Sequence, residues 1–302
     1  MLSHQLQSRP RIAVCFYGNL RTFRRCLGAL RKNLLDLYDC DIFMHTWDRY
    51  DHNSKTWHGF RCGADKIVDK EKIKRLLHIS DDQIIVEPTP FDDNKNLYYY
   101  EGNTFSSFGL KCVWHAMGAV NKLRYEYART HGIKYDAVVF IRPDVFLNTK
   151  FNLIDTITNE NALYFVGNLV GQIDDIKQIR ASDIFFWARP DVIDSVMKKM
   201  TLHIKNGETL SILPEGLFIK NIISAGATPI CCADYKYGSD FYILRPRRKF
   251  RMSRDIITLH THRDVVFIGL LMCLGPVIDI NIKFFNRFAI HFSIGNSQPR
   301  GC

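Results

Sequence analysis

Several signatures that would assign the chain to a familiar class are missing from its sequence. The nine cysteines are scattered and no two have CxxC spacing, which argues against a zinc site or a disulfide framework and favours a reducing compartment. Neither G-x-G-x-x-G nor G-x-x-x-x-G-K-[S/T] occurs, so neither a dinucleotide-binding protein nor a P-loop protein is indicated.

Long apolar stretches are also scarce. Residues 1–11 lack the apolar core of a secretory signal. The longest apolar run, residues 265–278, is interrupted by Gly275 and Pro276 and is shorter than the about 20 residues that a membrane-spanning helix needs. We therefore expect a cytoplasmic protein whose apolar run packs in a core or touches a membrane surface from the side.

The composition is that of a globular protein with a surplus of positive charge. The chain has 302 residues, of which 46% are hydrophobic and 24% are charged, and its formal net charge is +10. Such a surplus favours an anionic partner: a nucleotide, a phosphate, nucleic acid or a membrane surface. Without internal repeats or linkers, we expect one domain over residues 11–264. It would lie between a flexible N-terminus at residues 1–10 and an apolar and basic tail at residues 265–302, packed on the domain or facing a membrane.

The N-terminal part of the sequence predicts a β-α-β unit. Residues 11–17 are rich in strand formers, and Gly18 ends the run. Leucines at spacings of three and four predict a helix over residues 20–37, and residues 40–45 predict a second strand. A unit of this kind implies a parallel sheet, so the expected fold class is α/β.

The rest of the chain predicts further helices and strands. Residues 88–102 carry two prolines and are expected to form a long loop over a site. Asn103 or Thr104 is expected to cap a helix that runs to Thr130. Further strands are predicted at residues 83–86, 136–141, 162–166, 184–187, 228–231 and 242–244, and further helices at residues 70–78, 190–203 and 214–226.

The turn after the first strand is the first candidate for a binding site. Ligands of open α/β sheets lie at the carboxyl ends of strands, and a helix N-terminus favours phosphate. Gly18 lets the backbone approach a ligand, and Arg21 adds a guanidinium donor. The alternative is an ordinary turn between a strand and a helix.

A second candidate follows the most hydrophobic strand, residues 136–141. It ends in Arg142-Pro143-Asp144, which projects a carboxylate from a buried strand. A buried carboxylate needs a partner. That partner is either a divalent cation bridging a diphosphate or the neighbouring Arg142.

Together these segments resemble a known family. Residues 12–23 (IAVCFYGNLRTF), 38–43 (YDCDIF) and the segment from Tyr135 to Asp144 resemble GT-A-type glycosyltransferases encoded in bacterial surface-polysaccharide clusters, with relatives in some large viruses. The resemblance covers roughly residues 11–240. It implies a GT-A-like, Rossmann-like, mostly parallel sheet flanked by helices. In that family a strand ends in an Asp-x-Asp that grips the metal and diphosphate of a nucleotide sugar, but here Arg142 replaces the first Asp.

The resemblance also implies roles for individual residues. The cofactor would be Mn²⁺ or Mg²⁺, and Arg142 is expected to replace part of its charge unless Asp144 holds the ion alone. The cation ligands would be Asp144, His260 and His262, and the nucleotide sugar would contact Tyr17, Gly18, Arg21, Thr22, Lys111, Arg142 and Asp144. The alternative for the His260-Thr261-His262 segment is a surface turn, and for Lys111 a solvated helix face.

Two carboxylates are candidates for the general base of an inverting transfer. Asp183 precedes an aromatic strand, where the resembled family holds its acceptor, and Glu215 follows Pro214 at a helix start. Each has a structural alternative, because Asp183 could cap an element and Glu215 could simply complement the helix dipole.

The expected function is transfer of a sugar from a nucleotide-sugar donor to a hydroxyl of a growing surface glycan, which is free or linked to a lipid. Six cations lie within residues 245–254, so binding to an anionic membrane surface is also expected, as a peripheral protein. A solvated loop is the alternative for this basic run.

The alternative functions are a phosphate-group transferase acting on a glycan and a basic nucleic-acid-binding protein. Nucleic acid is not expected, because the sequence has no helix-turn-helix, RRM or zinc-finger signature.

Overall fold

Seven strands form the main sheet of the protein. The computed structural model describes residues 9–51, 66–91, 97–100, 103–153, 159–166, 182–206, 214–232 and 235–245, all within the unit Met1–Lys249. The sheet order is β10-β8-β9-β6-β1-β2-β3. Its strands are β1 (Arg11–Tyr17), β2 (Asp39–Trp47), β3 (Ile84–Glu87), β6 (Ala137–Ile141), β8 (Ala162–Val166), β9 (Phe185–Ala188) and β10 (Thr228–Cys232).

The sheet is mostly parallel, as the β-α-β pattern predicts. β1 pairs in parallel with β2 and β6, β2 with β3, and β8 with β10. Among the described strands of this sheet β9 is the exception, because it runs antiparallel to both β6 and β8. The amino end of β9 therefore lies at the same sheet edge as the carboxyl end of β6.

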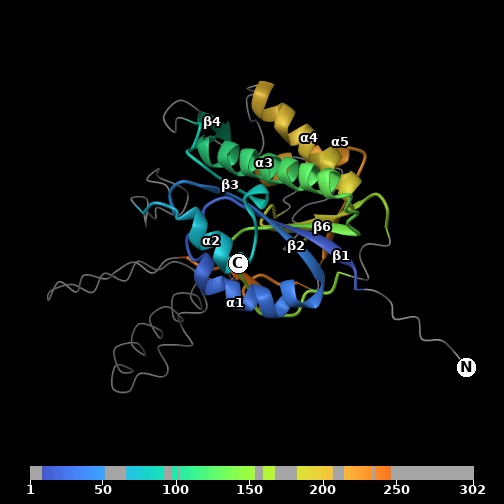
Figure 1. The fold of residues 1–302 in the computed structure, drawn as a ribbon. Coiled ribbons are helices and arrows are strands. Elements are labelled where there is room, and N and C mark those ends of the chain that lie inside the picture. The colour runs from blue at the N-terminus through green and yellow to red at the C-terminus, as the bar shows by residue number, and fades with distance from the viewer. Residues whose placement is uncertain are drawn as a thin grey trace, which may run out of the picture. The chain divides into compact units, whose positions relative to one another are not determined.

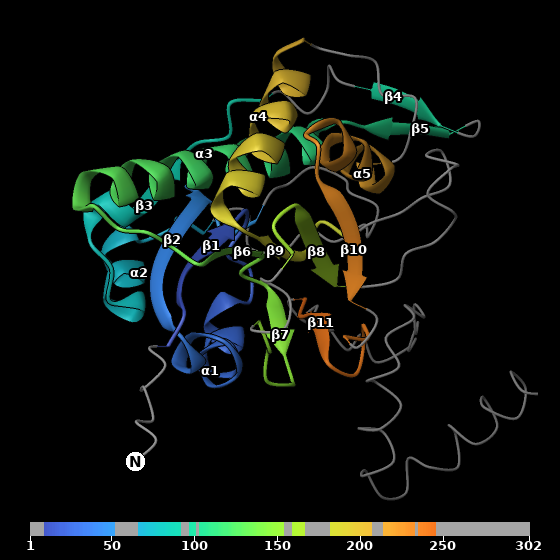
Figure 2. The same ribbon diagram turned by 90° about the vertical axis from the view of Figure 1, so that its right-hand side faces the viewer.

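Helices cover both faces of the sheet (Figures 1 and 2). α1 (Phe23–Asn33) and α2 (Lys70–Leu77) pack on one face with Ile12, Val14 and Phe16. α3 (Phe108–His131), α4 (Pro190–Asn206) and α5 (Pro214–Ser224) lie on the other. The alternation along β1 explains this, because Ala13, Cys15 and Tyr17 point to the α3 side and are buried there. None of the helices in the described part of the chain is long and apolar enough to cross a membrane.

Three predictions about the bounds of elements are wrong. Residues 97–100, expected in a loop, form β4 (Leu97–Tyr100), and β5 (Asn103–Ser106) pairs with it, so α3 begins only at Phe108. Three consecutive tyrosines favour an extended chain more than the nearby prolines oppose it. The predicted helix over residues 20–37 is also shorter. α1 ends at Asn33 and is followed by the 3₁₀ turn η1 (Leu35–Leu37).

Short elements complete the described fold. β7 (Val145–Leu147) was not predicted, and it pairs antiparallel with β11 (Phe241–Ile243) in a separate two-stranded sheet. A second 3₁₀ turn, η2 (Asp81–Gln83), precedes β3. β7 directly follows Asp144 and packs against α1, so the chain after the central strand is held on the α1 side of the sheet.

The order of the strands defines where a ligand would bind. β2 and β3 follow β1 on one side of it in the sheet, whereas β6, the next strand of the sheet along the chain, lies on the other side of β1. The strand order therefore reverses at β1. Ligands of open α/β sheets bind beyond the carboxyl ends of the strands at such a reversal. The carboxyl ends of β1 and β6 are Tyr17 and Ile141, so the turns at Gly18 and Arg142 lie at this point.

Candidate functional site

The turn after β1 has an uncommon backbone conformation. Gly18 has φ +92°, and its N–H donates to the carbonyl of His45 over 3.1 Å. Arg21 has φ +39°, and its N–H donates to the carbonyl of Tyr50 over 3.1 Å. Non-glycine residues rarely adopt positive φ, and such strain gathers at functional sites. The turn fixes the start of the Arg21 side chain beside the end of β6.

Asp144 lies at the centre of three guanidinium groups. Its carboxylate is completely buried. One oxygen accepts from Arg142 at 2.7 Å, Arg21 at 3.0 Å and Arg245 at 3.1 Å. The other oxygen accepts from Nε of Arg142 at 2.9 Å. We refer to Arg21, Arg142 and Arg245 as the arginine cluster.

Three separate segments hold the arginine cluster together. The N–H of Leu244, just after β11, donates to the carbonyl of Asp144 over 2.7 Å, which places Arg245 beside the carboxylate. The hydroxyl of Thr22 donates to the carbonyl of Leu244. Asp51 pairs with Nε of Arg21 at 2.9 Å. Three cations thus face two buried carboxylates, which leaves one positive charge unbalanced among these five groups.

The pKa values follow from this crowding. Burial alone would raise the pKa of Asp144, but the charges of Arg142, Arg21 and Arg245 outweigh burial and hold the pKa well below its usual range. Burial and the neighbouring Arg21 and Arg142 lower the pKa of Arg245 to about 10. Arg245 therefore keeps its charge at neutral pH, and the cluster favours a further anion.

The residues around Asp144 do not fit Mn²⁺ or Mg²⁺. These ions need several oxygen ligands, whereas the neighbours of this carboxylate are three cationic nitrogen donors. A divalent cation would have to displace them and then lie against their charges. The other two residues of the expected metal set, His260 and His262, lie outside the described residues.

Asp183 reaches the same edge because β9 is antiparallel. The N–H of Arg142 donates to the carbonyl of Ile184 over 3.1 Å, and the hydroxyl of Tyr17 donates to the carbonyl of Asp183. Burial and the charge of Glu215 raise the pKa of Asp183 to about 6. The two candidate bases therefore lie close enough for the charge of Glu215 to act on Asp183, which the sequence analysis did not predict. A pKa of about 6 suits Asp183 to proton transfer near neutral pH.

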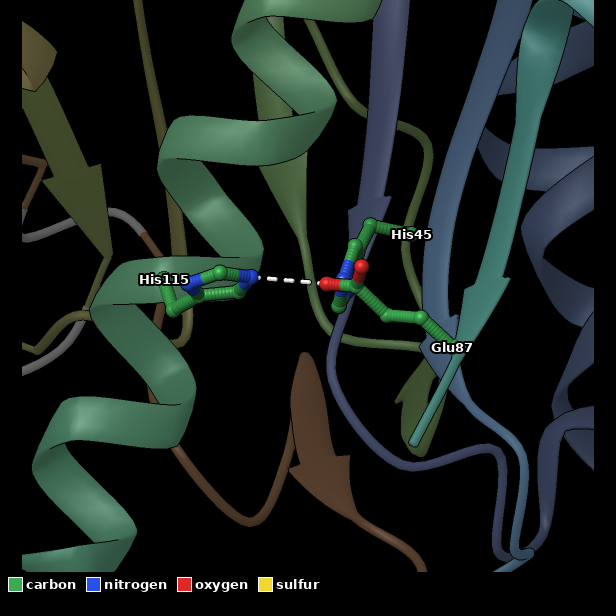
Figure 3. Close-up of side chains that lie close together, drawn as sticks. All are labelled: His45, Glu87 and His115. Atoms are coloured by element: carbon green, nitrogen blue, oxygen red, sulfur yellow. Dashed lines mark hydrogen bonds and ion pairs between the residues drawn. The ribbon is translucent and has the colours of Figure 1, made fainter. Parts of the chain in front are cut away.

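A second cluster lies on the α3 side of the sheet (Figure 3). Nε2 of His45 on β2 is 2.9 Å from Oε1 of Glu87 at the end of β3, and Nε2 of His115 on α3 is 2.7 Å from the same oxygen. Burial lowers the pKa of His45, so this imidazole is neutral at pH 7. The sequence analysis did not find this cluster. The signals in the sequence were the position of His45 at the end of a predicted strand and a polar stripe on α3, formed by Ser107, Lys111 and His115 at a spacing of four residues.

That stripe differs from the expected solvated face. Ser107 is buried and His115 bonds to Glu87. Lys111 lies on α3, one turn before His115. The strand β7, which directly follows Asp144, lies on the other face of the sheet, with α1. The structure thus brings Tyr17, Gly18, Arg21, Thr22, Arg142, Asp144, Asp183 and Glu215 to one edge and adds Asp51 and Arg245 to them.

Neither the protein families nor the curated proteins compared with the chain include a match. No protein-family model matches the chain, and no curated protein matches it significantly. The geometry of the sheet edge is therefore what indicates its chemistry.

Proposed function

We propose that the protein is a GT-A-like glycosyltransferase that moves a sugar from a nucleotide-sugar donor to a hydroxyl of a glycan. One observation carries the proposal. At the strand-order reversal, a cluster of three arginines lies beside a carboxylate whose pKa is raised to about 6. A reaction that releases a diphosphate and takes up a hydroxyl proton needs these two groups side by side.

The arginine cluster would bind the donor diphosphate. Guanidinium groups donate in a planar fork that matches phosphate oxygens, and each charged hydrogen bond is worth roughly 1.5–3 kcal/mol. Arg21, Arg142 and Arg245 are 12%, 18% and 24% exposed, so each side chain reaches the surface while most of it stays fixed. In this proposal Asp144 does not touch the substrate. It is a positioning residue, because its ion pairs hold the three guanidinium groups together at the diphosphate site.

The chemical step needs no resident cation in this proposal. The acceptor oxygen forms a bond to the anomeric carbon as the bond from that carbon to the diphosphate oxygen breaks. The electron pair leaves with the diphosphate, and the arginine cluster stabilises its charge. For an inverting transfer, the acceptor proton passes to the carboxylate of Asp183, and the negative charge of Glu215 keeps that carboxylate basic.

The same arginine cluster supports the second candidate, a phosphate-group transferase acting on a glycan. Such an enzyme would place the transferred phosphate, rather than a leaving diphosphate, against the three guanidinium groups. The acceptor would again be a hydroxyl deprotonated by Asp183. The two candidates differ in the bond of the donor that breaks. A glycosyltransferase breaks the bond between the anomeric carbon and the diphosphate oxygen, whereas a phosphate-group transferase breaks a bond between phosphorus and oxygen. The group found on the acceptor, a sugar or a phosphate, therefore distinguishes them.

Donor binding tests the proposal. The full chain is screened by thermal unfolding against UDP, GDP, CMP and dTDP sugars, with and without Mn²⁺. A donor at about 100 times its Kd stabilises the folded state by about 2.7 kcal/mol, which raises the Tm clearly. We expect one nucleotide class to do so without Mn²⁺. A shift that requires Mn²⁺ would restore the cation at Asp144, and no shift with any donor would refute the proposal.

Two arginines three residues apart supply the matched variants. Arg21→Ala should weaken donor binding by about 10–100-fold, because it removes a charged donor from the diphosphate site. Arg24→Ala removes the same charge from the exposed side of α1 and should leave the Kd unchanged. Equal effects of the two changes would show that only long-range charge attracts the donor.

A further inference from the structure

The cluster of His45, Glu87 and His115 joins three separate elements. His45 lies on β2, Glu87 ends β3, and His115 lies on α3, which covers this face of the sheet (Figure 3). One ligand atom from each residue lies within 4.8 Å of the other two. The two imidazoles converge on a single carboxylate oxygen.

The donor set is one that transition metals prefer. Two imidazole nitrogens and one carboxylate oxygen hold zinc in sites that keep a fourth position open. A metal of this class binds the ionised form of a carboxylate and the neutral form of an imidazole. Both imidazole nitrogens lie against the same oxygen of Glu87, so the three ligand atoms are already close together.

The two distances between an imidazole nitrogen and the carboxylate oxygen need only a small adjustment to admit an ion. Ligands about 2.0–2.1 Å from zinc in a tetrahedron lie roughly 3.3 Å apart. The two nitrogen–oxygen distances are 2.9 and 2.7 Å, so they would lengthen by roughly half an ångström. Glu87 and His115 are 36% and 34% exposed and can move, whereas His45 is fixed by complete burial.

The surroundings favour an ordered site with access from solvent. Trp47 stacks on the ring of His115 at 5.7 Å and meets the ring of His45 edge-on at 4.8 Å. Phe91 contacts His115 edge-on at 5.7 Å. Aromatic rings therefore set the orientation of both imidazoles, while the exposed sides of Glu87 and His115 provide a way in.

We propose that His45, Glu87 and His115 form a binding site for a divalent transition-metal cation of the zinc class, with one coordination position open to an oxygen ligand. The site is separate from Asp144 and lies one strand away from the turn that carries Arg21, because His45 is in register with Tyr17. It goes beyond the proposed glycosyl transfer and does not depend on it. When bound, the ion would join α3 to the ends of β2 and β3.

Cobalt binding to the full chain tests this site. Co²⁺ reports the environment of a zinc site through its visible absorption. After treatment with a chelator, the protein should bind one equivalent of Co²⁺ with a tetrahedral or five-coordinate spectrum. Zn²⁺ should then displace the Co²⁺ and remove the spectrum. The Tm should rise with Zn²⁺ concentration, because the ion binds the folded state.

Matched histidine variants on one helix locate the ion. His115→Ala should weaken Co²⁺ binding by at least tenfold and abolish the spectrum. His131→Ala, on the same helix but 43% exposed and outside the cluster, should change neither. Because His115 is partly exposed, its loss should leave the Tm without metal nearly unchanged, which shows that the variant folds.

Two results would overturn the site. The first is that the wild-type chain takes up no Co²⁺ or Zn²⁺. The second is that uptake and spectrum persist in both His115→Ala and Glu87→Gln, which would assign the metal to other residues. Donor binding by the arginine cluster is measured separately in the presence of a chelator, so failure of the metal site leaves the proposed transfer activity tested on its own.

Discussion

The arginine cluster and the His45–Glu87–His115 cluster lie at the ends of neighbouring strands of one sheet, yet they differ in the side chains that surround their carboxylates. In the first, three guanidinium groups face two buried carboxylates, Asp144 and Asp51. In the second, one half-exposed carboxylate faces two imidazoles, and burial keeps His45 neutral. Charged guanidinium groups around a carboxylate favour an additional anion, whereas imidazoles around a carboxylate favour a cation. We therefore expect the first cluster to bind an anion and the second to bind a cation.

The two clusters also differ in how much stability the fold should lose when the carboxylate of the cluster is replaced. Buried guanidinium groups cannot give up their charge, so they depend on Asp144 for folding. Neutral imidazoles need only a hydrogen-bond acceptor. This difference predicts a large effect of substitution at Asp144 and a small one at Glu87, with Asp183 between them.

The largest expected effect on stability is that of Asp144→Asn. It leaves the arginine cluster with no buried counter-charge but Asp51, and breaking a buried pair in this way costs about 3–5 kcal/mol. Urea unfolding measures the loss. Inorganic pyrophosphate should restore part of the stability of this variant, because the anion takes the place of the carboxylate.

Asp51→Asn is the control for this substitution, since Asp51 pairs with Arg21. Its loss should be clearly smaller than that of Asp144→Asn. If the two losses are equal, Asp144 does not hold the cluster together. If pyrophosphate stabilises neither variant, the cluster does not bind an anion.

Asp183→Asn should lower the rate of transfer by about 10²–10⁴-fold if Asp183 is the general base. In the wild-type protein, kcat should rise with pH through about 6, because the base acts only after it has lost its proton. The variant should lack this rise. Asp36→Asn, an exposed carboxylate on η1, serves as the control and should keep both the rate and the pH profile.

The same substitution should stabilise the fold above pH 6. The pKa of Asp183 is raised from its ordinary value of 3.8 to about 6, so the folded state holds this proton more tightly than the unfolded state. Stability from this group is therefore present below about pH 4 and is lost as pH rises to about 6. Asp183→Asn should increase the free energy of unfolding by about 1–3 kcal/mol at pH 8 and by nearly nothing at pH 3.5. No gain at pH 8 would mean that the carboxylate is better solvated than its burial indicates.

The smallest expected effect is that of Glu87→Gln in metal-free protein. Its amide oxygen still accepts from both imidazoles, so the free energy of unfolding should change by less than about 1 kcal/mol. Urea unfolding beside Asp144→Asn gives the comparison directly. A loss as large as that at Asp144 would show that the imidazoles carry charge and that the two clusters are alike.

The parts of the fold that local sequence determines were the ones predicted well. The β-α-β start follows from strand formers before Gly18 and leucines at helical spacing after it. The turn at Arg142 and Asp144 follows a run of apolar residues that are all buried in β6. The mostly parallel α/β class is confirmed for the same reason, because each unit is specified within a few dozen residues.

What the sequence could not provide depends on contacts between distant segments. β9 is buried on both sides, so its sequence has no alternation to reveal that it runs antiparallel. Arg245 joins Asp144 from 101 positions away in the chain. His45, Glu87 and His115 come together only once β2, β3 and α3 are placed, and the register that sets them is a property of the folded sheet.

The reversed direction of β9 decides whether the two halves of the candidate site can share a substrate. Asp183 lies two residues before β9, and Phe185, the first residue of β9, is paired with Ile141 at the carboxyl end of β6. A parallel β9 would carry Asp183 to the opposite end of the sheet from Arg142. The direction of one strand therefore separates a sheet edge that can both hold an anion and take up a proton from one that could only bind.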